Sequence, residues 1–131
     1  MYLYPSLITA LTTLLYLVLS VNVGRARAKY KIMPPAMSGN EDFERVVRVQ
    51  QNTLEQLVFF FPVLWLFSVY VSPIWGAGIG ALWIIGRIIF AWGYYQAAEK
   101  RIAGFAISIL SSMTLLLGSL VSIGLQLFQT F

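Results

Sequence analysis

The sequence from residue 43 to residue 71 reads FERVVRVQQNTLEQLVFFFPVLWLFSVYV. Its first half is rich in charged and amide side chains, and its second half is apolar. Arg48, Asn52 and Glu55 stand at positions i, i+4 and i+7, so they share one face of an α-helix, whereas Gln50 points almost the opposite way. The stretch therefore predicts a transmembrane helix that carries a polar stripe into the bilayer.

Three further segments are long enough to cross a bilayer core of about 30 Å, which takes about 20 apolar residues of helix. They are residues 4–23, 75–95 and 102–128. Asn40 or Asp42 could cap the helix at 43–71, and Pro73 falls in the break that follows it. The first segment lacks a basic start and a small-residue cleavage site, so we expect a retained span rather than a signal peptide.

The composition agrees with this prediction, because 59% of the 131 residues are hydrophobic and only 11% are charged. A soluble domain of this size needs a larger charged surface. The expected fold is an all-α integral membrane protein, a single domain over residues 1–131 with a four-transmembrane-helix bundle.

Basic residues cluster in two of the connections between spans. These residues are Arg25, Arg27, Lys29 and Lys31 after the first span, and Lys100 and Arg101 after the third. In a four-span chain both connections lie on one side of the membrane, and the positive-inside rule places that side in the cytosol. We therefore expect both termini on the non-cytosolic side. The net charge of +4 follows from the same loops, which disfavours nucleic acid as a partner.

The residue types that are missing restrict the chemistry. The chain has no cysteine and no histidine, which excludes disulfides and thiolate metal sites from this chain and removes the usual general base. We expect no metal, and a mechanism that depends on Arg, Tyr, Glu, Asn, Gln or Ser or on a group that the ligand brings.

The third span carries a second stripe at positions i, i+3, i+7 and i+14, formed by Arg87, Phe90, Tyr94 and Arg101. Counted along the helices from the cytosolic side, Glu55 and Arg87 both lie about 20 Å deep, so they could pair. A charge at mid-bilayer costs about 2.5–3.5 kcal/mol. The two stripes therefore either hold the bundle together or bind a polar, multiply charged ligand that enters from the cytosol, and the surplus of donors favours the second interpretation.

Small residues form stripes on the last two spans. On the third span they are Gly76, Gly78, Gly80, Gly86 and Gly93, and on the fourth Gly104, Ser108, Ser111, Ser112, Gly118, Ser119 and Ser122. Small side chains let membrane helices approach closely, so we expect packing rather than a catalytic serine. The glycines do not follow a strand, which excludes a nucleotide-binding loop.

The stretch from Phe43 to Glu55 resembles the signature of the MAPEG family, the membrane-associated proteins in eicosanoid and glutathione metabolism. Two further pieces agree with it in spacing, residues 24–27 ahead of Pro34-Pro35, and Gly86-Arg87 through Gly93-Tyr94-Tyr95 to Lys100-Arg101. The resemblance covers nearly the whole chain. It is stronger toward the microsomal glutathione S-transferases than toward leukotriene-C synthase.

The resemblance implies a homotrimer that binds glutathione between neighbouring protomers near the cytosolic face. It assigns the contacts of one protomer to Arg48, Asn52, Glu55, Tyr94 and Arg101, and those of its neighbour to Arg27 and Gln50. Arg87 joins this set because it shares the stripe of the third span. In catalytic members of the family the arginine that matches Arg101 stabilises the glutathione thiolate.

The expected activity is that of a membrane-bound glutathione transferase that conjugates apolar electrophiles arriving through membrane lipid, with peroxidase activity toward lipid hydroperoxides as a further expectation. Arginines suit the two carboxylates of glutathione, and a glutamate suits its ammonium group. Gln56 and Phe90 replace two tyrosines of leukotriene-C synthase, which disfavours leukotriene synthesis.

Two other functions remain open. One is a non-catalytic lipid-binding or scaffold protein of the same family, like the five-lipoxygenase-activating member. The presence of Arg101 argues against it, because that relative lacks the matching arginine. The other is a small multidrug exporter, which also has four spans and a membrane glutamate. The arginines near Glu55 argue against this, because they would repel cationic drugs.

Overall fold

The computed structural model describes all residues from Met1 to Phe131, and the chain is entirely helical. Four long helices are joined in the order α1 (Leu3–Tyr30), α2 (Glu41–Tyr70), α3 (Pro73–Gln96) and α4 (Ile102–Thr130), with a short 3-10 helix, η1 (Ala98–Arg101), before α4. Each long helix has the length and apolar character needed to cross a membrane. The prediction of an all-α bundle with four candidate spans is therefore confirmed.

Side chains cap two of these helices where the sequence suggests that they begin. Asn40, and not Asp42, caps α2, because its Oδ1 accepts a hydrogen bond from the backbone N–H of Phe43 at 3.0 Å. The Ser72 hydroxyl caps α3 in the same way, from the N–H of Trp75 at 3.2 Å, and Pro73 occupies the first turn. Such caps satisfy backbone donors that have no partner inside a helix. The tight Val71–Ser72 connection makes α2 and α3 antiparallel neighbours.

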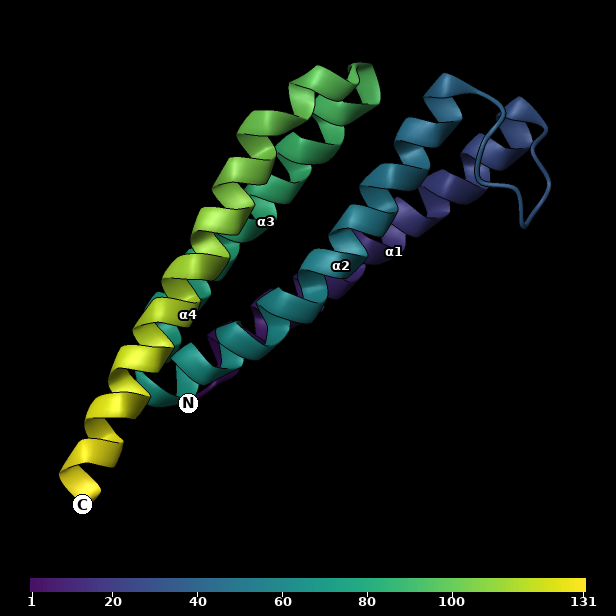
Figure 1. Ribbon diagram of the computed structural model, residues 1–131. Coiled ribbons are helices and arrows are strands. Elements are labelled where there is room, and N and C mark those ends of the chain that lie inside the picture. The colour runs from purple at the N-terminus through teal and green to yellow at the C-terminus, as the bar shows by residue number, and fades with distance from the viewer.

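The bundle has the shape of a V (Figure 1). One arm is the pair of α1 and α2, and the other is the pair of α3 and α4. The arms meet near the N-terminus, and we call this the narrow end. They diverge toward the wide end, where α1 ends, α2 begins and η1 lies. Both termini lie toward the narrow end, and the basic connections lie at the wide end, as the four-span topology predicts.

Large apolar side chains hold the narrow end together. The rings of Phe60 on α2 and Trp83 on α3 stack with centroids 4.1 Å apart. Around them Ile8, Leu64 and Leu115 bring α1, α2 and α4 into one buried cluster. Toward the wide end a smaller buried cluster of Leu19, Val49, Phe90 and Ala91 joins α1, α2 and α3, and polar side chains line the space beside it.

The helices α3 and α4 cross at a contact between glycines. A Cβ atom on Gly104 would overlap the backbone of Phe90, and one on Gly86 would lie 2.9 Å from the backbone nitrogen of Ser108. The neighbouring Ser108, Ser111 and Ser112 are buried as well. The prediction that small residues serve helix packing is therefore confirmed at this crossing, whereas Gly78 is exposed and a Cβ atom there would meet nothing within 4 Å.

Two tryptophans on α3 mark the limits of the apolar belt. Trp75 and Trp92 are 70% and 69% exposed, and their separation of 17 residues corresponds to about 26 Å of helix. Tryptophan is enriched where hydrocarbon meets headgroups, and the hydrocarbon core is about 30 Å thick. Trp92 therefore places the wide end at a lipid–water interface.

Candidate functional site

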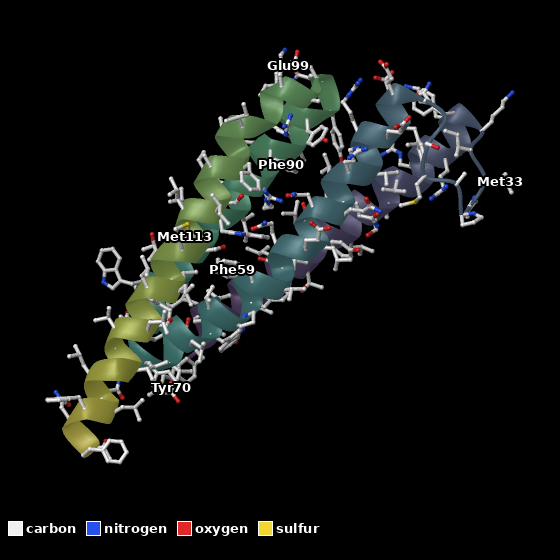
Figure 2. The ribbon with its side chains drawn as sticks, viewed as in Figure 1. Met33, Phe59, Tyr70, Phe90, Glu99 and Met113 are labelled. Carbon is white, nitrogen blue, oxygen red and sulfur yellow. The ribbon has the colours of Figure 1, made fainter.

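A cavity of about 480 Å³ opens at the wide end between the two arms of the V. Its lining comes from α2, from α3, and from the junction of η1 with α4. The lining residues are Arg48, Gln51, Asn52, Glu55, Phe90, Tyr94, Arg101, Ile102 and Phe105. Figure 2 shows side chains projecting into the space between α2 and the α3–α4 pair at the level of Phe90. Sites for small molecules commonly enclose about 300–1,000 Å³, so the volume suits a ligand of peptide size.

Helical spacing explains why the chain builds this lining. Arg48, Asn52 and Glu55 project from one face of α2, as their spacing of four and three residues requires. Phe90 and Tyr94 are likewise one turn apart on α3 and pack edge to face, with ring centroids at 5.5 Å. Five of the predicted site residues, Arg48, Asn52, Glu55, Tyr94 and Arg101, therefore surround one cavity.

Most polar groups of the lining retain their bonding capacity. The side chains of Arg48, Gln51, Glu55 and Tyr94 make no hydrogen bond within the protomer, and the one ion pair of the structure, between Arg45 and Asp42, lies outside the lining. Arg101 donates from Nη1 to the carbonyl oxygen of Ala98 at 2.6 Å, which leaves its other nitrogens available. With two guanidinium groups and one carboxylate, the cavity suits a ligand of net negative charge.

Arg87 lies behind the cavity wall and not in it. Its side chain is fully buried, and Nη1 donates to Asn52 Oδ1 at 2.7 Å and to Thr53 Oγ1 at 3.3 Å. Nε and Nη2 donate to Ser108 Oγ at 3.2 and 3.0 Å. The guanidinium carbon stands 4.1 Å from the ring centroid of Phe90, whose ring belongs to the lining.

Two expectations about Arg87 are therefore corrected. It does not pair with Glu55, and it does not line the cavity that the other predicted residues form. Spacing along the sequence gives the distance of a residue along the helix axis but not its direction around that axis. Around that axis, Arg87 points between α2 and α4, where neutral oxygens and aromatic faces solvate its charge, while Glu55 is exposed at the cavity.

Arg27 and Gln50 also lie outside this cavity. Arg27 donates from Nη1 to the carbonyl oxygen of Ala36 at 2.7 Å, and its guanidinium lies over the Phe43 ring. Gln50 donates from Nε2 to Ser20 Oγ on α1 at 3.1 Å. A single protomer therefore does not bring these two side chains to Arg48 and Arg101.

The structure adds Gln51, Ile102 and Phe105 to the lining. Phe105 stands four residues after Arg101, so the spacing within a helix could have identified it. Ile102 depends on where η1 gives way to α4, for which the sequence carries no clear signal. Together with Phe90, these two residues make one wall of the cavity apolar.

Comparisons with known proteins identify a family and several relatives of this chain. The model of the MAPEG family matches residues 5–121. An uncharacterized protein of Synechocystis sp. is 67% identical over 127 residues, 97% of this chain and 93% of its own. Microsomal glutathione S-transferase 2 of Homo sapiens is 44% identical over 99 residues, 74% of this chain and 67% of its own. Leukotriene C4 synthase of Cavia porcellus is 35% identical over 96 residues, 73% of this chain and 64% of its own.

Proposed function

The chain belongs to the MAPEG family and is an integral, multi-pass membrane protein, and from this premise we propose that it is a glutathione transferase. It joins the thiol of glutathione to apolar electrophiles. The observation that carries the proposal is the cavity in which Arg48, Asn52, Glu55, Tyr94 and Arg101 converge with unused donors and acceptors. Relatives named microsomal glutathione S-transferase 2 add support.

The charges of the lining match those of the tripeptide. Glutathione carries two carboxylates and one ammonium group, and arginine binds a carboxylate through two parallel N–H···O bonds. Arg48 takes one carboxylate, and Glu55 takes the ammonium group. Asn52, which Arg87 holds from behind, offers its amide N–H groups to the peptide backbone of the ligand.

Arg101 activates the sulfur in this proposal. A free thiol has a pKa near 8.5, so little of it is thiolate at neutral pH. A guanidinium within hydrogen-bond distance stabilises the anion, and the proton passes to water. The sulfur then forms a bond to the electrophilic carbon, and the leaving group departs with its electron pair. No histidine is needed for this chemistry.

The same thiolate accounts for a peroxidase activity toward lipid hydroperoxides. Attack of the sulfur on the terminal peroxide oxygen releases the lipid alcohol and leaves a sulfenic acid on glutathione. A second glutathione reduces this intermediate, which yields glutathione disulfide and water. The apolar wall of Phe90, Ile102 and Phe105 receives the lipid part of either substrate from the bilayer.

A neighbouring subunit completes the site in this proposal. Arg48, Gln51, Glu55 and Arg101 are exposed in the isolated protomer, so the cavity is open along one side. In a homotrimer the α1–α2 pair of the next protomer closes it and supplies Arg27 and Gln50. The wide end, which holds the basic connections, faces the cytosol, from which glutathione enters.

The test compares wild type with Arg101→Ala and with the matched control Lys100→Ala, in detergent. Turnover of glutathione with chlorodinitrobenzene, and then with a lipid hydroperoxide, is the readout. We expect kcat of Arg101→Ala to fall about 10²–10³-fold, as for loss of one donor to a developing anion, and Lys100→Ala to stay near wild type. Equal rates in all three proteins would remove Arg101 from the mechanism. A wild type that binds glutathione but turns over neither electrophile would instead be a non-catalytic binding protein.

A further inference from the structure

A second cavity of about 440 Å³ lies at the wide end, between α1, α2 and α3. Its lining residues are Asn22, Arg25, Ala26, Lys29, Tyr30, Val46 and Tyr95. It shares no residue with the first cavity. On α3, Tyr94 faces the first cavity and Tyr95 the second, because consecutive helical residues point about 100° apart. The two cavities therefore lie on different faces of the bundle and can act independently.

The lining of the second cavity is positively charged. Arg25 and Lys29 project from adjacent turns of α1, no acidic side chain belongs to the lining, and neither cation has an ion-pair partner. Asp42 contacts one lining residue, since it accepts a hydrogen bond from the Tyr30 hydroxyl at 3.5 Å, but its carboxylate is already paired with Arg45. The second cavity therefore holds two cations, Arg25 and Lys29, without a neutralising carboxylate.

Neutral donors stand beside these cations. Asn22 Nδ2 donates to the Tyr95 hydroxyl oxygen at 3.2 Å, which leaves the hydroxyl hydrogen of Tyr95 free to donate to a ligand. Both side chains are half-buried. Val46 and the buried Ala26 form an apolar base. The cavity thus combines two positive charges, one free hydroxyl donor and apolar neighbours. Such an arrangement suits a compact oxyanion, which accepts charge-assisted hydrogen bonds.

The cavity lies at the depth of lipid headgroups. The 28 residues of α1 span about 42 Å, about 12 Å more than the hydrocarbon core. The turns after Val23, which carry Arg25 and Lys29, therefore extend past the hydrocarbon at the wide end. Trp92, one turn before Tyr95 and largely exposed, marks the interface at the same level. Below the cavity, the exposed Val18 and Val21 of α1 and Ile88 of α3 offer an apolar surface for acyl chains.

We propose that this cavity binds the phosphate of an anionic phospholipid headgroup. Arginine and lysine between membrane helices at this depth recognise such phosphates, the guanidinium through two N–H groups and the ammonium as a point charge. A soluble phosphate offers the same chemistry. The lipid fits better because exposed apolar side chains of α1 and α3 stand below the cavity, where acyl chains would lie. This site does not depend on the transferase function.

The first test measures lipid retention by native mass spectrometry of the full chain in detergent. Wild type is offered phosphatidylglycerol and, separately, phosphatidylcholine. We expect wild type to retain phosphatidylglycerol preferentially, and the double variant Arg25→Gln with Lys29→Gln to lose about tenfold or more of this preference. The matched control, Lys31→Gln with Lys100→Gln, removes the same charge from the same end outside the cavity and keeps the preference. Equal loss in both double variants, or no loss in either, would overturn the site.

Two further experiments test the proposal, one with a Tyr95 variant and one with inorganic phosphate. Tyr95→Phe leaves both charges and the helix packing intact, and we expect it to lower phosphatidylglycerol retention about fivefold through the lost hydroxyl donor. Unchanged retention in this variant contradicts the built site. Inorganic phosphate added to lipid-free protein provides the second arm. If it raises the unfolding temperature as much as phosphatidylglycerol does, the ligand is a soluble anion and the lipid assignment fails.

Discussion

Arg48 brings a positive charge to the first cavity without an intramolecular partner. In the proposed function this charge binds a carboxylate of glutathione. Because hydrogen bonds to charged groups contribute about 1.5–3 kcal/mol, we expect Arg48→Ala to raise the Kd of glutathione about tenfold to hundredfold in isothermal titration calorimetry. Arg25→Ala removes an equal charge from the same end of the bundle but lies in the other cavity, and it should leave the Kd unchanged. An unaltered Kd in Arg48→Ala would contradict the assignment.

Arg87 affects the first cavity indirectly, because it contacts the lining residue Asn52 and does not itself line the cavity. Its planar group reaches Asn52 on α2 and Ser108 on α4 at once, which a lysine ammonium cannot do with the same geometry. We expect Arg87→Lys, which keeps the charge, to free the Asn52 side chain and raise the Kd of glutathione about tenfold. Arg25→Lys is the conservative control outside the site.

A change of kcat separates this positioning role from a catalytic one. If Arg87→Lys binds glutathione more weakly but turns over normally at saturating glutathione, Arg87 positions Asn52. If the Kd stays at the wild-type value, the contact between Arg87 and Asn52 does not contribute to glutathione binding. Arg87 then only holds α2, α3 and α4 together.

At the scale of helices, the contact between α3 and α4 controls where Arg101 and Phe105 stand relative to Phe90. A methyl group on Gly104 has no room beside the Phe90 backbone, whereas one on Gly124 of the same helix meets nothing within 4 Å. We expect Gly104→Ala to lower the free energy of unfolding by about 1–3 kcal/mol through overpacking. Gly124→Ala should leave it unchanged or raise it by up to about 1 kcal/mol, because alanine favours helix. Denaturant titrations followed by circular dichroism measure both, and equal effects would show that the crossing tolerates a Cβ atom.

The pattern of the sequence was sufficient to predict four helices, their antiparallel order and the shared face of Arg48, Asn52 and Glu55. It placed the end of the first span near Val23, where apolar residues stop, although α1 continues to Tyr30. Charge ends a hydrophobic segment but not a helix, since alanine, arginine and lysine are good helix formers.

The sequence pattern does not predict the hydrogen-bond partners of Arg87, which include Asn52 and Ser108. Periodicity gives the face and depth of a side chain but not the rotation of two helices about their contact. That rotation depends on the glycines at the α3–α4 crossing, which bring Ser108 within 3.2 Å of the guanidinium. The sequence identified Ser108 only as a small residue for packing, and it serves as a hydrogen-bond acceptor as well.

At the scale of the whole molecule, one asymmetry produces both cavities. Stacked aromatic rings close the narrow end, and the arms therefore diverge where the polar halves of α2 and α3 lie. The headgroup region meets this wide end. In the proposed function, glutathione therefore reaches the first cavity from water, and a lipid-borne electrophile reaches it through the apolar wall. Under that proposal the fold brings a polar and an apolar reactant to one boundary.

Sharing of the site between protomers leads to a complementation experiment. Arg101 belongs to the first cavity, while Arg27 lies on the other arm of the V, outside it. If a neighbour supplies Arg27, then Arg27→Ala and Arg101→Ala chains are each defective alone. In mixed oligomers, however, the intact Arg101 of the first chain meets the intact Arg27 of the second. We expect co-expressed, co-purified chains to recover a substantial share of wild-type turnover with chlorodinitrobenzene.

Mixing the two proteins after separate purification gives the control, because chains that do not exchange form no hybrid site. In the contradicting outcome, co-expression restores no turnover even though differently tagged chains co-purify. Each site is then built within one protomer. That result contradicts the shared site but not the oligomer.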